Sequence, residues 1–361
     1  MDGRHVSALA VAATYIGTVV GAGFASGQEV LQFFGHFGLR GIPAIGLAVA
    51  LFSLYGYVIL ELGRSLGARS HLPVVREAGG RVVGTAIDGV ITFFLFGALV
   101  AMTAGAGAVL HEQFGLSAAV GNVLLVVAAF LTVLAGIHGV VTAISVVVPA
   151  LLVAVVGISV ATLLRTPLDL AAVRSLDSTR AAVPSWPLSA VVYVSYNIVL
   201  AVGVLAPLGA IAEGPHPLKL GAILGGIGLG LGALAIHLAL LATLPKSAAV
   251  QVPMVYIAGR FPVLVQVGYS LVLLLEIYTT AVGNLYGFVA RIAKPGTRAS
   301  RWLVIAASLV ALLAGRLGFS RIVRTLYPAV GYAGLLLLLA LTYQLVRRVF
   351  IQRDETGRGT Q

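Results

Sequence analysis

The chain has 361 residues, of which 59% are hydrophobic and only 10% are charged, and its formal net charge is +11. A water-soluble domain carries about 25% charged residues and could not bury this much apolar surface, so the composition excludes that class and predicts a membrane protein. Because the chain has no cysteine, disulfides, thiolate metal sites and cysteine nucleophiles are excluded as well.

Ten segments are long and apolar enough to form membrane-spanning helices, each of which needs about 20 residues. In chain order they are 8–34, 41–66, 84–111, 118–137, 140–164, 189–212, 219–244, 262–292, 300–316 and 325–347. The connections between them are too short to hold a second domain. We therefore predict a single all-α transmembrane domain over 1–361, without a cleavable signal peptide.

A long polar connection, 165–187, separates five of these helices from the other five. This arrangement predicts two inverted repeats, about 8–164 and 189–347, followed by a tail over 348–361. Inverted repeats place binding sites near the bilayer midplane, where the repeats meet. The connection 64–83 is also long and polar.

Basic side chains are more frequent on the side that holds both chain ends when ten spans are counted from Met1. The positive-inside rule then predicts a multi-pass protein of the bacterial inner membrane with both termini and the tail in the cytoplasm. This bias accounts for the net charge without a nucleic-acid partner. On the outer side, 247–260 is either a short helix over a vestibule or a plain loop.

The first predicted helix carries four glycines near its middle, Gly17, Gly21, Gly23 and Gly27. Glycine costs up to about 1 kcal/mol per helical position relative to alanine, so this run favours local unwinding. Unwound backbone is tolerated at membrane depth only where it packs in protein or lines a polar cavity. Its free carbonyls could hold a cation, and the amides that start the outer half-helix could hold a carboxylate.

The alternative interpretation is helix packing, because small residues four apart let two helix backbones approach closely. The polar residues that follow, Ser26, Gln28 and Glu29, favour unwinding instead. Polar groups at membrane depth are costly and tend to face a transport pathway.

The run Gly17-Thr-Val-Val-Gly-Ala-Gly-Phe24 resembles the unwound first helix of LeuT-fold transporters in the amino acid–polyamine–organocation superfamily. The longer run Val20-Gly-Ala-Gly-Phe-Ala-Ser-Gly-Gln-Glu29 is similar to the YkvI-type bacterial membrane proteins. The ten-helix count extends the resemblance over most of the chain. It implies a secondary active transporter that works by alternating access, with broken first and sixth helices and no catalytic residues.

The resemblance also implies a sodium site between the first and eighth helices. Its ligands would be the carbonyls of Gly17, Val20 and Glu276 and the hydroxyls of Thr279 and Thr280. Such an all-oxygen set suits a hard cation. The alternative is that the two threonines bond back to their own helix.

The implied pocket for a small, amino-acid-like solute lies where the first and sixth helices unwind. The amides from Gly23 to Ser26 would hold a carboxylate, and the sixth helix contains Gly203 and Pro207 as possible breaks. The expected substrate-binding residues are Ala22, Gly23, Phe24, Ala25, Ser26, Thr103, Ser195, Tyr196 and Asn197. For Thr103, helix packing is the stronger interpretation.

Three further polar residues, Gln28, Glu29 and Glu61, are candidates for coupling or gating. Glu61 either pairs with Arg64 one turn later or reaches the unwound amides of the sixth helix. Glu276 or Glu29 could carry a proton in place of sodium. A channel or a solute sensor without turnover is the alternative from another class. No cofactor besides Na⁺ is expected, and the sequence predicts neither the solute nor the oligomeric state.

Overall fold

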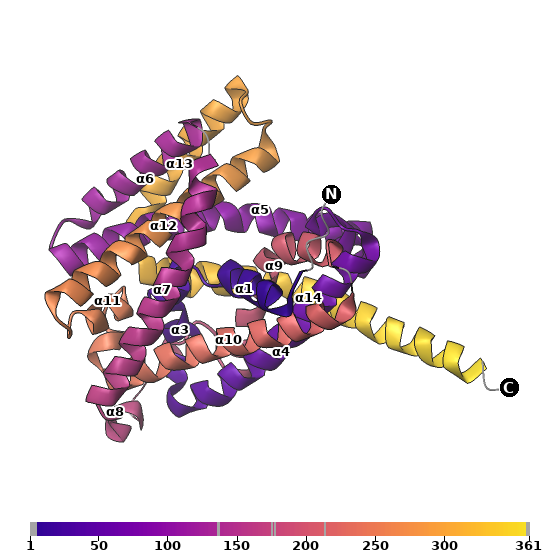
Figure 1. Ribbon diagram of the computed structural model, residues 1–361. Coiled ribbons are helices and arrows are strands. Elements are labelled where there is room, and N and C mark those ends of the chain that lie inside the picture. Colours follow the sequence, from indigo (N-terminus) through magenta and orange to yellow (C-terminus); the bar gives the residue numbers. More distant parts are fainter. Residues whose placement is uncertain (1–5, 136–137, 175, 177, 213, 359–361) are drawn as a thin grey trace.

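The computed structural model describes residues 6–135, 138–174, 176, 178–212 and 214–358, and every regular element in this part is a helix (Figure 1). Nine of its helices are long and apolar enough to cross a membrane. They are α4 (Gly41–Leu66), α5 (His71–Phe114), α6 (Ala118–Ala135), α7 (His138–Arg165), α9 (Trp186–Ala210), α10 (Pro215–Ala242), α12 (Val263–Ile292), α13 (Arg298–Ala314) and α14 (Phe319–Arg358).

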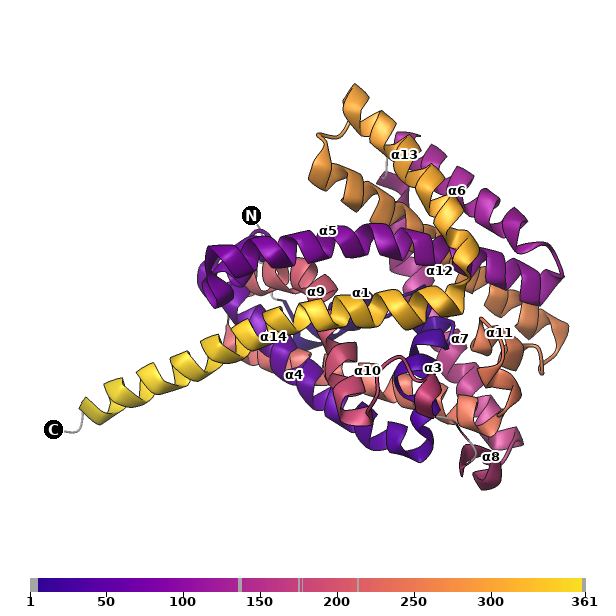
Figure 2. The same ribbon diagram turned by 180° about the vertical axis from the view of Figure 1, so that it is seen from behind.

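The remaining predicted segment, 8–34, is the first in the chain. It is divided into α1 (Ala8–Val19), α2 (Ala22–Ala25) and α3 (Gln28–Phe33). Each piece is too short to span a bilayer, although the three in succession replace one spanning helix. The prediction of an all-α membrane protein is therefore confirmed. The C-terminal end of α14 projects beyond the other helices in both views (Figures 1 and 2).

Short helices occupy the connections between the long ones. They are η1 (Gly35–Arg40), α8 (Leu170–Arg174), η2 (Ser178–Arg180), η3 (Lys246–Ala248), α11 (Pro253–Ala258) and η4 (Gly315–Leu317). The segment 247–260 thus contains a short helix and is not a plain loop. The polar connection 64–83 is also partly helical, because α5 starts at His71 and bends at Gly80, whose φ of 74° suits glycine.

Small residues let the helices approach closely along several seams. A Cβ at Gly63 of α4 would overlap the carbonyl oxygen of Ala206, and one at Gly209 of α9 would overlap that of Leu60. Nearer the start of α9, Gly331 of α14 lies against the backbone of Val192. Because lipid is as apolar as the protein interior, this close backbone packing is what holds such helices together.

The predicted break in the sixth helix is wrong, because α9 is a continuous α-helix from Trp186 to Ala210. Pro207 lies in its last turn, so the hydrogen bond that it removes falls at the end of the helix. Gly203 alone does not interrupt the helix. Helix α9 also packs closely against α4 and α14. Backbone groups freed by a break in α9 would find no water there.

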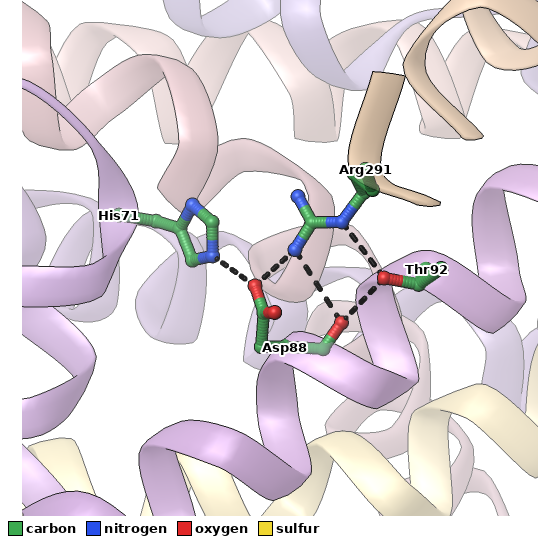
Figure 3. A network of polar contacts seen from close by, with 4 residues as sticks. All are labelled: His71, Asp88, Thr92 and Arg291. Atoms are coloured by element: carbon green, nitrogen blue, oxygen red, sulfur yellow. Dashed lines mark hydrogen bonds and ion pairs between the residues drawn. The ribbon is translucent and has the colours of Figure 1, made fainter. Parts of the chain in front are cut away.

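A polar network joins the ends of α5 and α12 (Figure 3). Asp88 accepts hydrogen bonds from Arg291 and lies 2.9 Å from Nε2 of His71, and Nε of Arg291 donates to Oγ1 of Thr92 at 2.7 Å. The Asp88 side chain is 40% exposed, so the pair contributes little to stability. The network joins the start of α5 at His71 to the middle of α5 and to the end of α12.

Candidate functional site

The opening segment loses its helical winding at two points. Val20 (φ −76°, ψ 107°) and Gly21 (φ −126°, ψ −173°) are extended, so α1 stops before α2 begins. Gly27 then adopts a left-handed conformation, with φ 79°, before α3. The predicted interruption of this segment is therefore confirmed. Carbonyl groups at the end of α1 have no continuing helix to bond to and are available to a ligand.

Protein groups satisfy the backbone at the second interruption. The hydroxyl of Tyr269 donates to the carbonyl of Ala25 at 2.5 Å, and the amide of Met254 in α11 donates to the carbonyl of Ser26 at 3.0 Å. A Cβ at Gly27 would lie 2.8 Å from the Met254 side chain. This end of the broken segment is therefore covered by α11, and only the first interruption faces open space.

The expectation that the amides from Gly23 to Ser26 hold a carboxylate is wrong for Ala25 and Ser26. The amides of Ala25 and Ser26 already donate to the carbonyls of Gly21 and Ala22, at 3.0 and 2.8 Å. The Glu29 carboxylate occupies the space beside Gly23, because a Cβ added to Gly23 would overlap Oε1 of Glu29. A carboxylate of the chain itself thus lies where a solute carboxylate was expected.

A cavity of about 280 Å³ lies between the first interruption and α5, α7, α9, α12 and α14. Ten residues singled out from the sequence line it, namely Gly17, Val20, Ala22, Gly23, Glu29, Tyr196, Asn197, Glu276, Thr279 and Thr280. All five residues expected for the cation and four of the nine expected for the solute thus share one space, although they come from the opening segment, α9 and α12.

Glu276 gives the α12 wall of the cavity its charge. Its Oε1 accepts a hydrogen bond from Thr280 at 3.3 Å, while its buried Oε2 has no partner among the described residues. The hydroxyl of Thr279 bonds to the carbonyl of Glu276 at 3.1 Å, as the local alternative predicted for a threonine. An unpartnered buried carboxylate oxygen beside hydroxyls and carbonyls is a donor set that suits a hard cation.

Glu29 is the second acidic side chain in the cavity lining. The hydroxyl of Tyr196 in α9 donates to Oε2 of Glu29, and the Glu29 residue is 6% exposed. Tyr196 also packs against Tyr327 of α14 and Phe94 of α5, with ring centroids 5.2 and 6.1 Å away. All three rings line the same cavity as this carboxylate, and Tyr196 contacts it directly.

Several expected site residues lie outside the cavity lining, namely Phe24, Ala25, Ser26, Gln28, Glu61, Thr103 and Ser195. The hydroxyl of Thr103 bonds to the carbonyl of Leu99 at 2.9 Å, and its neighbour Met102 faces the cavity instead. Ser195 donates to the carbonyl of Gly331 at 2.7 Å and so packs α9 against α14. Both assignments to the pocket are wrong because adjacent helical residues point about 100° apart.

Glu61 forms an ion pair with Arg64 of its own helix, with Nη2 to Oε1 at 2.6 Å and Nε to Oε2 at 3.0 Å. The i,i+3 alternative is therefore correct, and contact with the amides of α9 is not made. Gln28 is buried, but its side chain lies outside the cavity. Among the expected gating residues, only Glu29 faces the cavity.

The lining residues that sequence reasoning missed include Phe94, Met102, Asn284 and Tyr327. Apolar and aromatic residues inside a spanning helix give no signal that separates a cavity wall from a lipid contact. Asn284 could have been found, because it is a polar residue at membrane depth about two turns after Glu276. It extends the cavity along α12, away from α11.

Hydrogen bonds from α5 and α14 hold the start of α11, which covers the second interruption. The carboxylate of Glu112 accepts the amides of Gln251 and Val252 at 2.6 and 3.1 Å, and Oε1 of Gln251 accepts the amide of Phe319 at 2.8 Å. These bonds fix the start of α11 to α5 and α14.

No protein-family model matches the chain. It is 30% identical to the uncharacterized membrane protein YkvI of Bacillus subtilis over 344 residues, which cover 93% of this chain and 95% of that protein. Its fold is similar to that of MhsT in complex with L-phenylalanine, with a TM-score of 0.60, 16% identity, and coverage of 94% and 90%. A Na⁺-coupled sialic acid symporter gives a TM-score of 0.60, 14% identity, and coverage of 94% and 79%. These similarities identify the fold as that of the LeuT-type transporters.

Proposed function

Because the chain belongs to the family of the membrane protein YkvI and adopts the LeuT fold, we propose that it is a secondary transporter for a small solute, coupled to Na⁺. The observation that carries this proposal is the meeting of the α1 interruption with Glu276, Thr279 and Thr280 in one cavity. Solved proteins of the same fold include a Na⁺-coupled symporter.

The mechanism follows from the two walls of the cavity. A cation held by the carbonyls of Gly17 and Val20 and by the oxygens of α12 would draw the α1 break towards α12. Release of the cation would free α1 to move away on the Asn284 side. A solute bound in the same space would then be exposed on the Asn284 side, while α11 still covers the other end.

Sodium is expected to protect a cysteine placed at Asn284 from thiol reagents. In the cysteine-free chain, purified Asn284→Cys protein is expected to react at least about threefold more slowly in NaCl than in KCl of equal ionic strength. Cation-driven closure of α1 against α12 is the physical reason, since a threefold change needs less than about 1.4 kcal/mol. The rate of alkylation measures the effect.

Replacing Thr279 and Thr280 together by valine keeps the side-chain shape and should abolish the sodium effect. The matched control is Thr162→Val on α7, where a buried hydroxyl bonds only to the carbonyl of Ile158 in its own helix. Equal labelling rates of Asn284→Cys in both salts, in protein that is folded, would contradict sodium coupling.

Proton coupling is a second candidate, favoured by the unpartnered buried Oε2 of Glu276. It predicts that Asn284→Cys labelling responds to pH relative to a cysteine at the exposed position Thr85, and that Glu276→Gln removes this response. If the sodium effect persists without any pH response, the proton alternative is excluded. Counterflow of preloaded solute in proteoliposomes separates a carrier from a channel or a sensor.

A further inference from the structure

The cavity holds two buried carboxylates and no basic side chain among the described residues that line it. Glu29 is 6% and Glu276 is 4% exposed. An ionised carboxylate taken out of water and left without a partner is strongly unfavourable, so buried charges are paired. Two negative charges in one cavity therefore call for positive charge from the ligands.

The coupling cation accounts for one of these charges. The oxygens around Glu276 are a carboxylate, two hydroxyls and nearby backbone carbonyls, which is the chemistry that a metal cation prefers. Glu29 faces the cavity from a different segment and has Tyr196 as its hydrogen-bond donor. Its charge is left for the solute.

The surroundings of Glu29 suit an organic cation better than a metal ion. Phe94, Tyr196 and Tyr327 line the cavity as one group of rings, with centroids between 5.2 and 6.1 Å apart. The faces of aromatic rings attract ammonium groups. In the described part of the chain, no cluster of three His, Cys, Asp or Glu residues could bind a metal.

An anionic solute group would be repelled at the same place. The carboxylate of Glu29 lies directly against the α-carbon of Gly23, at the position where a solute carboxylate was expected from the sequence. A solute carboxylate would have to displace Glu29 or share the space with it, and two like charges at close range oppose each other.

We propose that the transported solute is a small organic cation whose ammonium group binds between Glu29 and the rings of Phe94, Tyr196 and Tyr327. This inference rests on the proposed transport function and specifies its substrate class. The cavity of about 280 Å³ suits a small carbon skeleton. Sodium at Glu276 and the ammonium at Glu29 together neutralise both acids.

Two sets of matched probes test the charge alone. Choline is compared with its uncharged carbon analogue and with the zwitterion glycine betaine, and propylammonium with propanol and with β-alanine. In thermal unfolding of the detergent-purified full chain in NaCl, at least one ammonium probe is expected to raise the melting temperature by about 3 °C or more. Its neutral and zwitterionic partners are expected to give no shift.

Glu29→Gln should abolish the ammonium shift while it keeps an oxygen to accept the Tyr196 hydroxyl. Glu29→Asp, which retains the charge on a shorter side chain, should keep a reduced shift. The control Glu61→Gln removes a carboxylate that pairs with Arg64 outside the cavity and should leave the shift unchanged.

Three results would each overturn the substrate assignment: no shift with either ammonium probe, an equal shift with a neutral or zwitterionic partner, or an unchanged shift in Glu29→Gln. The sodium effect on Asn284→Cys labelling is measured in parallel. If that effect persists while the ammonium probes fail, the substrate class is wrong and the sodium-coupled function stands.

Discussion

The variant Gly209→Ala is expected to be less stable than the native chain by about 1–3 kcal/mol, the usual cost of forcing an extra methyl group into a packed interior. The new Cβ would overlap the carbonyl oxygen of Leu60, which is backbone and cannot rotate away. Helices α4 and α9 would have to separate along the seam that also contains Gly63. Thermal unfolding in detergent measures the loss.

The matched control is Gly203→Ala on the same helix, where nothing lies within 4 Å of the new Cβ. Alanine should be neutral or slightly stabilising there, since it has the higher helix propensity. If both variants melted at the same temperature, close contact of α4 and α9 would not be a source of stability.

Gly23→Ala is expected to weaken binding of an ammonium probe by at least about tenfold, which corresponds to 1.4 kcal/mol. The new Cβ would occupy the place of the Glu29 Oε1 and push the carboxylate away from the cavity. Because the Glu29 side chain can rotate, the protein should still fold, with a loss no larger than that of the Tyr196 hydrogen bond, about 1.5–3 kcal/mol. Titration of the probe by thermal shift measures the effect.

Two controls isolate the cause. Gly21→Ala adds a methyl group two residues earlier, with nothing within 4 Å and an extended backbone that alanine adopts freely, so probe binding should be retained. In a Glu29→Ala background, Gly23→Ala should cause no further loss of stability, because its clash partner is absent. Normal probe binding by Gly23→Ala would show that the position of Glu29 is unimportant.

Local sequence signals predicted the features that depend on neighbouring residues. Apolar runs predicted ten membrane segments, nine of which are spanning-length helices in the described residues. The glycines from Gly17 to Gly27 predicted the interruption of the first helix, which the backbone contains at Val20 and Gly21. The polar run from Glu276 to Thr280 was also placed correctly in the cavity wall. Its role as an ion site stays a prediction.

The same reasoning failed where a pattern had two local solutions. Gly203 and Pro207 are compatible with a broken helix and with a continuous one, and the packing of α9 between α4 and α14 selects the continuous one. Thr103 and Ser195 carry hydroxyls at the right depth, but their bonds go to backbone carbonyls away from the cavity.

By itself, the sequence determined that the chain is a helical membrane protein, and its glycines favoured unwinding of the first span. Both signals depend only on residues close together in the chain. Only the tertiary structure decided which side chains meet across the cavity. It placed the Glu29 carboxylate against Gly23 and placed Phe94, Tyr196 and Tyr327 in the lining of the same cavity. The physical reason is that lipid and protein interior are both apolar, so hydrophobic periodicity does not reveal which face of a spanning helix turns inward.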